Sequence, residues 1–532
     1  MRKTFFVQLF AVLALICFQH AQASAQSLGN QVGEPAKEKI AGTQTYILLS
    51  DKSGTVVLHK KKTDAYEIHV FDVAMKLETT YEIKLPTKGK LKHEFVKAFG
   101  VEDKLVMFTT FYDEAEKVKS IYGWKLQTEG TYDAEYTLVD EIKGTDGVDP
   151  RSVKFELGKS DDGKLLYYFR QQTVAQGEAP RMAYKLFDKQ LGTKADKIIA
   201  TGFKAKSLHV GQLVVDGSSS LFMTARVQDV NMSKRPVRVE LPYFWTVLHY
   251  EVEKNNLREY PVNLGEGTFV HDVAINLFKS DDKLHAAGFY GASQRSGLSG
   301  SFITTTDIIT HQVLRKTIEP LSKEFTEIHK ATMRRFVDTN IPRKVIKGVM
   351  DVRPSLLVSN TGNVYLIGEI YRRNKQVPSG QKPDSYPDEK STITHYIQGM
   401  MVVNFNARGS VDWQASLALN QNPVNDEGAS IGFIRGMVRD KVALIYNDNP
   451  ANLQISDPAK KLNMEKPDTK SSAAMLAYVD KYGKVDADLV WTDKEEAGII
   501  LPYSAYPINR TQVMALAHSG KGTYRLVKLT FY

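Results

Sequence analysis

A short polar turn followed at once by an apolar, β-branched or aromatic run recurs about eight times along this chain. The turns lie at residues 51–54, 102–104, 160–164, 216–219, 280–283, 359–363, 439–441 and 509–511. The runs that follow them read TVVLHK, LVMFTTF, LLYYFR, LFMTARV, LHAAGFY, VYLIGEIY, VALIY and QVMALA. Asp, Asn, Ser and Gly suit hairpin turns because they tolerate positive φ or bond their own backbone. Recurrence of one such unit predicts a repeat fold.

Each unit offers four strand-like segments, as residues 93–142 and 151–202 illustrate. Seven full units start near residues 45, 93, 151, 206, 270, 351 and 428, and an eighth near residue 499 has only three segments. Four antiparallel strands in each unit are typical of a propeller blade. A β-sandwich or two β-domains in tandem are the alternatives.

The incomplete last unit predicts that a strand from the N-terminal part of the chain closes the ring, because an open blade leaves unpaired strand edges. Residues 34–42 would give eight blades and residues 43–50 would give seven. We therefore expect an all-β fold, a single propeller of eight or seven blades over 45–532. Residues 26–44 precede it and hold the possible ring-closing strand.

Two stretches interrupt the repeat. Residues 319–348 have a helical pattern, with Ser322 as an N-cap, and form the most basic segment of the chain. Residues 372–392 are polar and proline-rich, which predicts a long loop. Loops on a rigid scaffold often carry function. The basic residues that we expect to form a partner-binding surface are Arg334, Arg335, Arg343 and Lys344.

Residues 1–25 read as a secretory signal, with Arg2 and Lys3 before an apolar stretch and small-x-small cleavage sites at its end. The only cysteine, Cys17, lies in that stretch, and Ile16 before it does not fit a lipidation motif. The remaining chain has no cysteine for disulfides, thiolate metal sites or nucleophilic chemistry. We expect an exported protein, periplasmic or extracellular, with no membrane span after signal removal.

The formal charge is +9 at pH 7, and Lys and Glu are interleaved rather than clustered. This pattern is typical of a solvated surface and does not favour nucleic-acid binding. The chain contains no His-Glu-x-x-His or P-loop motif. Its histidines are scattered, and its Asp-rich turns lack the ligand spacing of a calcium loop. We therefore expect no metal and no cofactor.

Two segments combine polar side chains with apolar strands. One lies in the run VYLIGEIY, and the other, YNDNP, ends the equivalent strand of the next unit. A carboxylate among apolar neighbours costs free energy unless it is paired. Either these segments form a ligand or ion site at one face, or the carboxylate is satisfied by backbone amides or by Arg372 or Arg373. The candidate ligand-binding residues are Glu369, Tyr371, Asn447, Asp448 and Asn449.

The turn and strand SDDGKLLYY at 160–168 resemble the units of WD-repeat and TolB-like propellers, although the usual proline and Trp-Asp pair are missing. Residues 320–450, with NTGNVYLIGEIY, YIQGMMVVNFNARGSVDWQ and KVALIYNDNPAN, are similar to exported bacterial propeller-like proteins without an assigned activity. That resemblance implies export and a propeller, and it implies no reaction.

Three functions fit these observations. The first is a non-catalytic envelope protein that binds a partner through one propeller face, the partner being a protein or glycan of the cell envelope. The second is a polysaccharide lyase or hydrolase with a shallow site, for which Glu369, Tyr371 and Asp448 are the nominated residues. The third is an accessory scaffold of a cell-surface complex. The fold alone does not distinguish them.

Overall fold

The computed structural model describes the chain in ranges separated by gaps. These ranges are 28–36, 45–61, 65–88, 91–144, 149–172, 177–204, 206–229, 243–278, 282–293, 296–323, 325–327, 351–381, 390–457, 460–462, 464, 472–491, 498–518 and 523–532. The expected signal segment at 1–25 and the predicted partner-binding residues Arg334, Arg335, Arg343 and Lys344 lie outside the described residues.

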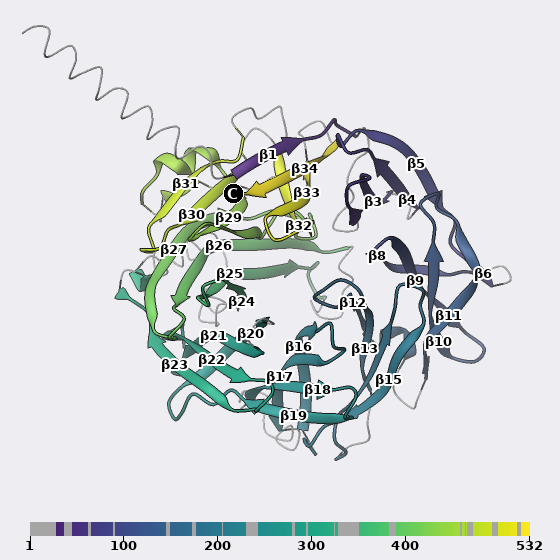
Figure 1. Cartoon of the computed structure of the whole chain (residues 1–532), viewed down its shortest axis with the longest axis horizontal. Helices are drawn as coiled ribbons and strands as arrows, with labels where there is room; N and C mark the ends of the chain where they lie inside the picture. The colour runs from purple at the N-terminus through teal and green to yellow at the C-terminus, as the bar shows by residue number, and fades with distance from the viewer. Residues whose placement is uncertain are drawn as a thin grey trace, which may run out of the picture.

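Eight four-stranded antiparallel sheets form the blades of one ring (Figure 1). Blade 1 comprises β2 (Tyr46–Ser50), β3 (Thr55–Lys60), β4 (Tyr66–Phe71) and β5 (Leu77–Ile83). Blade 2 comprises β8 (Glu94–Val101), β9 (Lys104–Asp113), β10 (Val118–Leu126) and β11 (Tyr132–Lys143). Blade 3 comprises β12 (Glu156–Lys159), β13 (Leu166–Gln172), β14 (Arg181–Phe187) and β15 (Thr193–Ala200). Blade 4 comprises β16 (Lys206–Val215), β17 (Leu221–Asp229), β18 (Tyr243–Glu251) and β19 (Asn256–Pro261).

Blade 5 comprises β20 (Phe269–Phe278), β21 (Lys283–Gly291), β22 (Gly300–Asp307) and β23 (Val313–Pro320). Blade 6 comprises β24 (Asp351–Val358), β25 (Val364–Gln376), β26 (Thr392–Phe405) and β27 (Val411–Gln421). Blade 7 comprises β28 (Phe433–Val438), β29 (Lys441–Asp448), β30 (Ala473–Val479) and β31 (Val485–Leu489). Blade 8 comprises β32 (Ile499–Pro507), β33 (Gln512–His518), β34 (Tyr524–Phe531) and β1 (Leu28–Val32). The all-β propeller is therefore confirmed, and the ring has eight blades rather than seven.

Smaller elements join or cap the blades. The short pair β6 (Thr87–Lys88) and β7 (Leu91–Lys92) connects blades 1 and 2. Two 3-10 helices are described, η1 (Pro150–Ser152) before blade 3 and η6 (Pro450–Gln454) after β29.

The eight predicted apolar runs form the second strand of each blade, counted from the ring axis. β9 and β29 are buried along almost their whole length, because neighbouring blades pack against both of their faces. The outermost strands differ. β5 alternates between half-buried and exposed residues along most of its length, as expected where one face meets solvent. Burial on both faces explains why the second strands gave the strongest sequence signal.

The ring closes where β1 pairs antiparallel with β34, from Leu28 opposite Phe531 to Val32 opposite Val527. The ring-closing strand lies within the predicted segment 26–44, but it is not supplied by residues 34–42 or 43–50 as expected. Residues 46–50 form β2, the innermost strand of blade 1, and Ala36 makes only a single bridge to Tyr524. β1 is the outermost strand of blade 8 and is nowhere fully buried, so its sequence, LGNQV, carries little hydrophobic pattern.

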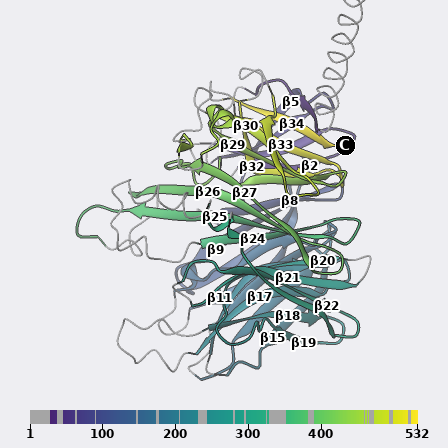
Figure 2. The same cartoon turned by 90° about the vertical axis from the view of Figure 1, so that its left-hand side faces the viewer.

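Antiparallel pairing gives the ring two distinct faces. One face holds the turns between first and second strands and those between third and fourth strands, and we call it the turn face. The connection face holds the turns between second and third strands and the links from one blade to the next. β25 and β26 are the longest strands, and their hairpin extends beyond the neighbouring blades (Figure 2).

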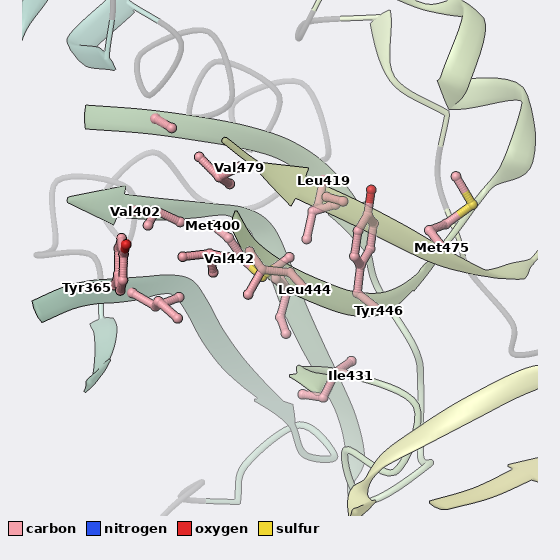
Figure 3. Close-up of a cluster of buried hydrophobic side chains, with 14 of the residues drawn as sticks. Tyr365, Met400, Val402, Leu419, Ile431, Val442, Leu444, Tyr446, Met475 and Val479 are labelled. Carbon is pink, nitrogen blue, oxygen red and sulfur yellow. The ribbon is translucent and has the colours of Figure 1, made fainter. Parts of the chain in front are cut away.

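The core lies between adjacent blades rather than at one centre. Figure 3 shows the cluster between blades 6 and 7, where Tyr365 and Met400 of blade 6 face Leu444 and Tyr446 of blade 7. Comparable clusters fill the other blade interfaces. Each blade therefore contributes both of its faces to the stability of the ring.

At their described ends, the two predicted interruptions belong to paired strands. Residues 372–376 continue β25 and residue 392 begins β26, so part of the predicted loop 372–392 is paired strand. Residues 319 and 320 end β23. After them Ser322 Oγ accepts the backbone N–H of Phe325 at 3.1 Å, as an N-cap does, and Phe325 is buried in the cluster between blades 5 and 6.

No helix among the described residues has the length and apolar character needed to cross a membrane.

Candidate ligand-binding sites

Glu369 lies on β25 with its carboxyl group facing blade 7, and only 7 % of the residue is exposed. Its Oε2 lies 4.0 Å from Nη1 of Arg353. Its Oε1 is buried and has no hydrogen-bond partner among the described residues. A buried acceptor without a partner is rare in folded proteins, and each one calls for an explanation.

Arg353 links Glu369 to two aromatic residues. It lies on the innermost strand β24, directly opposite Glu369 in the strand register. Its guanidinium carbon is 3.1 Å from the centre of the Tyr371 ring, a cation–π contact, and its side chain is 52 % exposed. The Tyr371 hydroxyl is 2.9 Å from Nδ1 of buried His395 on β26. Glu369, Arg353, Tyr371 and His395 therefore form one connected group, which we call the Glu369 group. Its carboxyl is buried, and its guanidinium is exposed to solvent.

Gly432 faces the Glu369 carboxyl from blade 7. Its φ is +91°, a left-handed conformation that favours glycine, and a Cβ there would lie 3.7 Å from Oε1 of Glu369. Blade 7 thus approaches the carboxyl at this point with backbone alone. No side chain is available from this position to pair with Oε1.

Burial shifts the pKa values of Glu369 and His395 in opposite directions. It raises the pKa of Glu369 to about 7, and the Arg353 charge offsets only part of that rise. Burial also lowers the pKa of His395. Near neutral pH the site therefore presents a carboxyl group that can donate or accept a hydrogen bond, beside a neutral imidazole.

The structure brings together two of the five candidate residues, Glu369 and Tyr371. Sequence reasoning missed Arg353 and His395, because they become neighbours of the candidate residues only through the pairing of β24 and β26 with β25. The alternative charged partners, Arg372 and Arg373, do not fill that role, because the cation beside Glu369 is Arg353.

Asn447 and Asn449 make structural contacts. Asn447 Nδ2 donates to the carbonyls of Ser430 and Ile500 at 2.8 and 2.7 Å, and its Oδ1 accepts from the Ile500 N–H, which ties blade 7 to blade 8. Asn449 Oδ1 accepts from the N–H of Ala451 and caps η6. These contacts explain why the two asparagines occur at the end of β29.

Asp448 lies apart from Glu369. Its Oδ1 accepts hydrogen bonds from Asn449 N–H and from Asn452 Nδ2, and it lines a cavity of about 320 Å³ between blades 6 and 7. The walls of that cavity include Tyr446, Asn452 and Lys461 but not Glu369 or Tyr371. The nominated grouping of Glu369, Tyr371 and Asp448 is thus divided between two places.

A larger cavity, of about 460 Å³, lies on the turn face between blades 4 and 5, where the sequence gave no candidate. Its walls include buried His249 and Glu251, both near the end of β18. Glu251 accepts from Lys254 at 2.6 Å, Arg258 at 2.9 Å and Asn256 at 3.1 Å. Burial raises the pKa of Glu251, but these hydrogen bonds outweigh burial and lower it to about 2.

Within the described ranges, no three His, Cys, Asp or Glu side chains gather in a way that could hold a metal ion.

No family model and no curated protein matches the chain, so the resemblance to exported bacterial propellers stays a prediction. Among solved structures, a mutant of the Synechocystis apocarotenoid oxygenase is similar at 8% identity and TM-score 0.29, covering 70% of this chain and 71% of that one. The β-propeller domain of the trilobed protease from Pyrococcus furiosus is similar at 10% identity and TM-score 0.28, covering 73% and 92%. At these TM-scores the likenesses carry no argument about chemistry or ligands.

Proposed function

We propose that this protein is an exported, non-catalytic binding protein that takes a glycan of the cell envelope at the Glu369 site, on the side of blade 6 that faces blade 7. The observation that carries the proposal is the buried Glu369 Oε1, which has no partner among the described residues and lies beside a half-exposed arginine. A ligand hydroxyl would supply the missing hydrogen bond.

The chemistry of the group favours a hydroxyl-rich ligand. Glu369 can donate or accept at neutral pH, Arg353 offers N–H donors, and both lie on inner strands that the ring holds rigidly. Binding residues on rigid elements are held more precisely than those on loops. A propeller with such a group on one side of a blade fits a binding or scaffold role.

The test is a glycan array of envelope oligosaccharides, probed with the full chain after signal removal. Glu369→Gln keeps the shape of the side chain but removes its charge, and Glu67→Gln is the matched control because Glu67 is also 7 % exposed. We expect the unaltered protein and the Glu67 variant to bind the same oligosaccharides, and the Glu369 variant to lose at least tenfold in affinity. Equal binding by all three would overturn the proposal.

The raised pKa of Glu369 favours one alternative, a polysaccharide lyase or hydrolase that uses this residue for acid–base chemistry. The same samples distinguish the two functions. Shortened oligosaccharides after incubation with the unaltered protein, and intact ones with Glu369→Gln, would establish catalysis and replace the binding function.

A further inference from the structure

One residue that lines the cavity between blades 4 and 5 has a buried ring nitrogen with no hydrogen-bond partner among the described residues. His249 lines this cavity of about 460 Å³ and is 4 % exposed. Its Nε2 has no hydrogen-bond partner among the described residues. The cavity is of a size that takes small ligands in other proteins.

Neighbouring side chains fix the orientation of the His249 ring. Phe222 stacks on it with ring centres 4.0 Å apart and an interplanar angle of 13°. On the Nδ1 side the Tyr260 hydroxyl lies 3.5 Å away, and that hydroxyl is 2.9 Å from Nδ1 of His311. One edge of the imidazole is thus held by this chain, and the opposite edge carries the buried Nε2, which has no hydrogen-bond partner among the described residues.

In the neutral tautomer that carries its hydrogen on Nδ1, His249 offers Nε2 as a hydrogen-bond acceptor. Burial lowers the pKa of His249 to about 4, so the ring is neutral near pH 7. Tyr260 has one hydroxyl hydrogen, and its shorter contact is to His311. If that hydrogen is donated to His311, His249 Nδ1–H donates to the Tyr260 oxygen, and Nε2 then carries a lone pair.

The charges around the cavity favour a cation. Among the described residues that line the cavity, Lys254 and Lys283 carry two ammonium groups and four residues carry carboxylates, while Leu277, Ile308 and Ile309 supply an apolar wall. The four carboxylates belong to Asp216, Glu251, Glu253 and Asp282. An anionic ligand would meet more charges of its own sign than of the opposite sign.

We propose that this cavity is a binding site for a small organic amine. The ammonium group donates a hydrogen bond to Nε2 of His249 and is attracted by the surrounding carboxylates, while the carbon chain packs on Leu277, Ile308 and Ile309. The site lies on the turn face and shares no residue with the Glu369 group, so it goes beyond the proposed function.

Three matched probes test the charge of the ligand. We expect hexylamine to bind in isothermal titration, and hexanol and hexanoate to bind at least tenfold more weakly. Hexylamine and hexanol carry the same hexyl chain, and the chain of hexanoate is one methylene shorter, which accounts for only about fourfold in affinity. Hexanol that binds as tightly as hexylamine would overturn the proposal, as would tighter binding of hexanoate.

Two variants test the residues. His249→Phe keeps a ring against Phe222 but removes Nε2, and we expect at least a tenfold loss of hexylamine affinity. The control is His285→Phe, which removes another buried imidazole, held 3.0 Å from Thr305 Oγ1 and outside the cavity, and should bind as the unaltered protein does. Unchanged affinity in His249→Phe would overturn the assignment.

A second variant, Asp282→Asn, tests the same site if the His249→Phe variant does not fold. Asp282 is exposed and has a φ of +51°, a conformation that asparagine also tolerates. We expect hexylamine to bind severalfold more weakly to this variant and hexanol to be unaffected. An equal effect on both probes, or on neither, would contradict recognition of charge.

Discussion

Two glutamates of this propeller are covered to almost the same extent and differ in almost everything else. The side chain of Glu251, between blades 4 and 5, is 11% exposed, and that of Glu369, between blades 6 and 7, is 10% exposed. Glu251 is covered by its own partners near the surface, and the pKa of its carboxyl falls to about 2. Glu369 is covered by the packing of blades, and the pKa of its carboxyl rises to about 7.

The difference shows that coverage alone does not tell whether a buried carboxylate is structural. Three hydrogen-bond donors reach Glu251, whereas the one cation near Glu369 is at 4.0 Å and leaves Oε1 without a partner among the described residues. A carboxylate whose partners are supplied by its own hairpin stabilises the fold. One that lacks partners destabilises the fold when ionised, which makes it a candidate for a functional role.

The largest expected effect is on the pH dependence of stability at Glu369. The folded pKa of about 7 exceeds the ordinary 4.5, so the folded state holds a proton that the unfolded state has lost between those pH values. Stability should therefore fall as pH rises from about 4.5 to about 7, by up to about 3 kcal/mol. Glu369→Gln should remove that slope and be more stable than the unaltered protein at pH 8.

Urea unfolding midpoints at pH 4.5, 6 and 8 provide the measurement. A Glu369→Gln variant that loses stability with pH as steeply as the unaltered protein would show that another group titrates there. In that case the contrast between the two glutamates would not hold.

A smaller effect of the opposite sign is expected at Glu251. Its folded pKa of about 2 lies below the ordinary 4.5, so its contribution is present above pH 4.5 and is lost as pH falls toward 2. Glu251→Gln should lower stability at pH 7 by about 1 kcal/mol, because solvent screens ion pairs near the surface. The deficit should shrink below pH 4, as followed by the same unfolding midpoints, and a deficit independent of pH would point to lost packing instead.

The smallest difference concerns two tyrosine hydroxyls that each contact a histidine. Tyr371 is buried against buried His395, so Tyr371→Phe should cost about 1 kcal/mol. Tyr260 and His311 are half-buried, so water can replace the lost contact, and Tyr260→Phe should cost only about 0.3 kcal/mol. Thermal unfolding of both variants measures the difference, and equal losses would contradict it.

Most of the fold could be predicted from local signals. Polar turns followed by runs that are apolar on both faces mark the second strand of every blade, because that strand is packed between neighbours. The closing strand β1 could not be found in the same way. It pairs on one edge only and is nowhere fully buried, so its five residues needed no hydrophobic alternation.

The candidate sites were only partly predictable. Glu369 stood out as an acid within an apolar strand, but Arg353 became its neighbour through pairing of β24 with β25. His249 lies in the apolar run YFWTVLHYE and is buried, so nothing in the sequence separates it from the core. A single sequence reveals neither the cavity built from two blades nor that Nε2 lacks a partner among the described residues.

The ring can close only after both β1 and its partner β34 have been synthesised. β1 is the first blade strand to be synthesised, and its partner β34 is the last. The edge of blade 8 therefore stays open until residues 527–531 have been synthesised, and closure must bring together residues that are far apart in the sequence. A chain released before residue 531 leaves strand edges unpaired, which makes it prone to aggregation and proteolysis. Synthesis through residue 531 is thus a precondition for a closed ring.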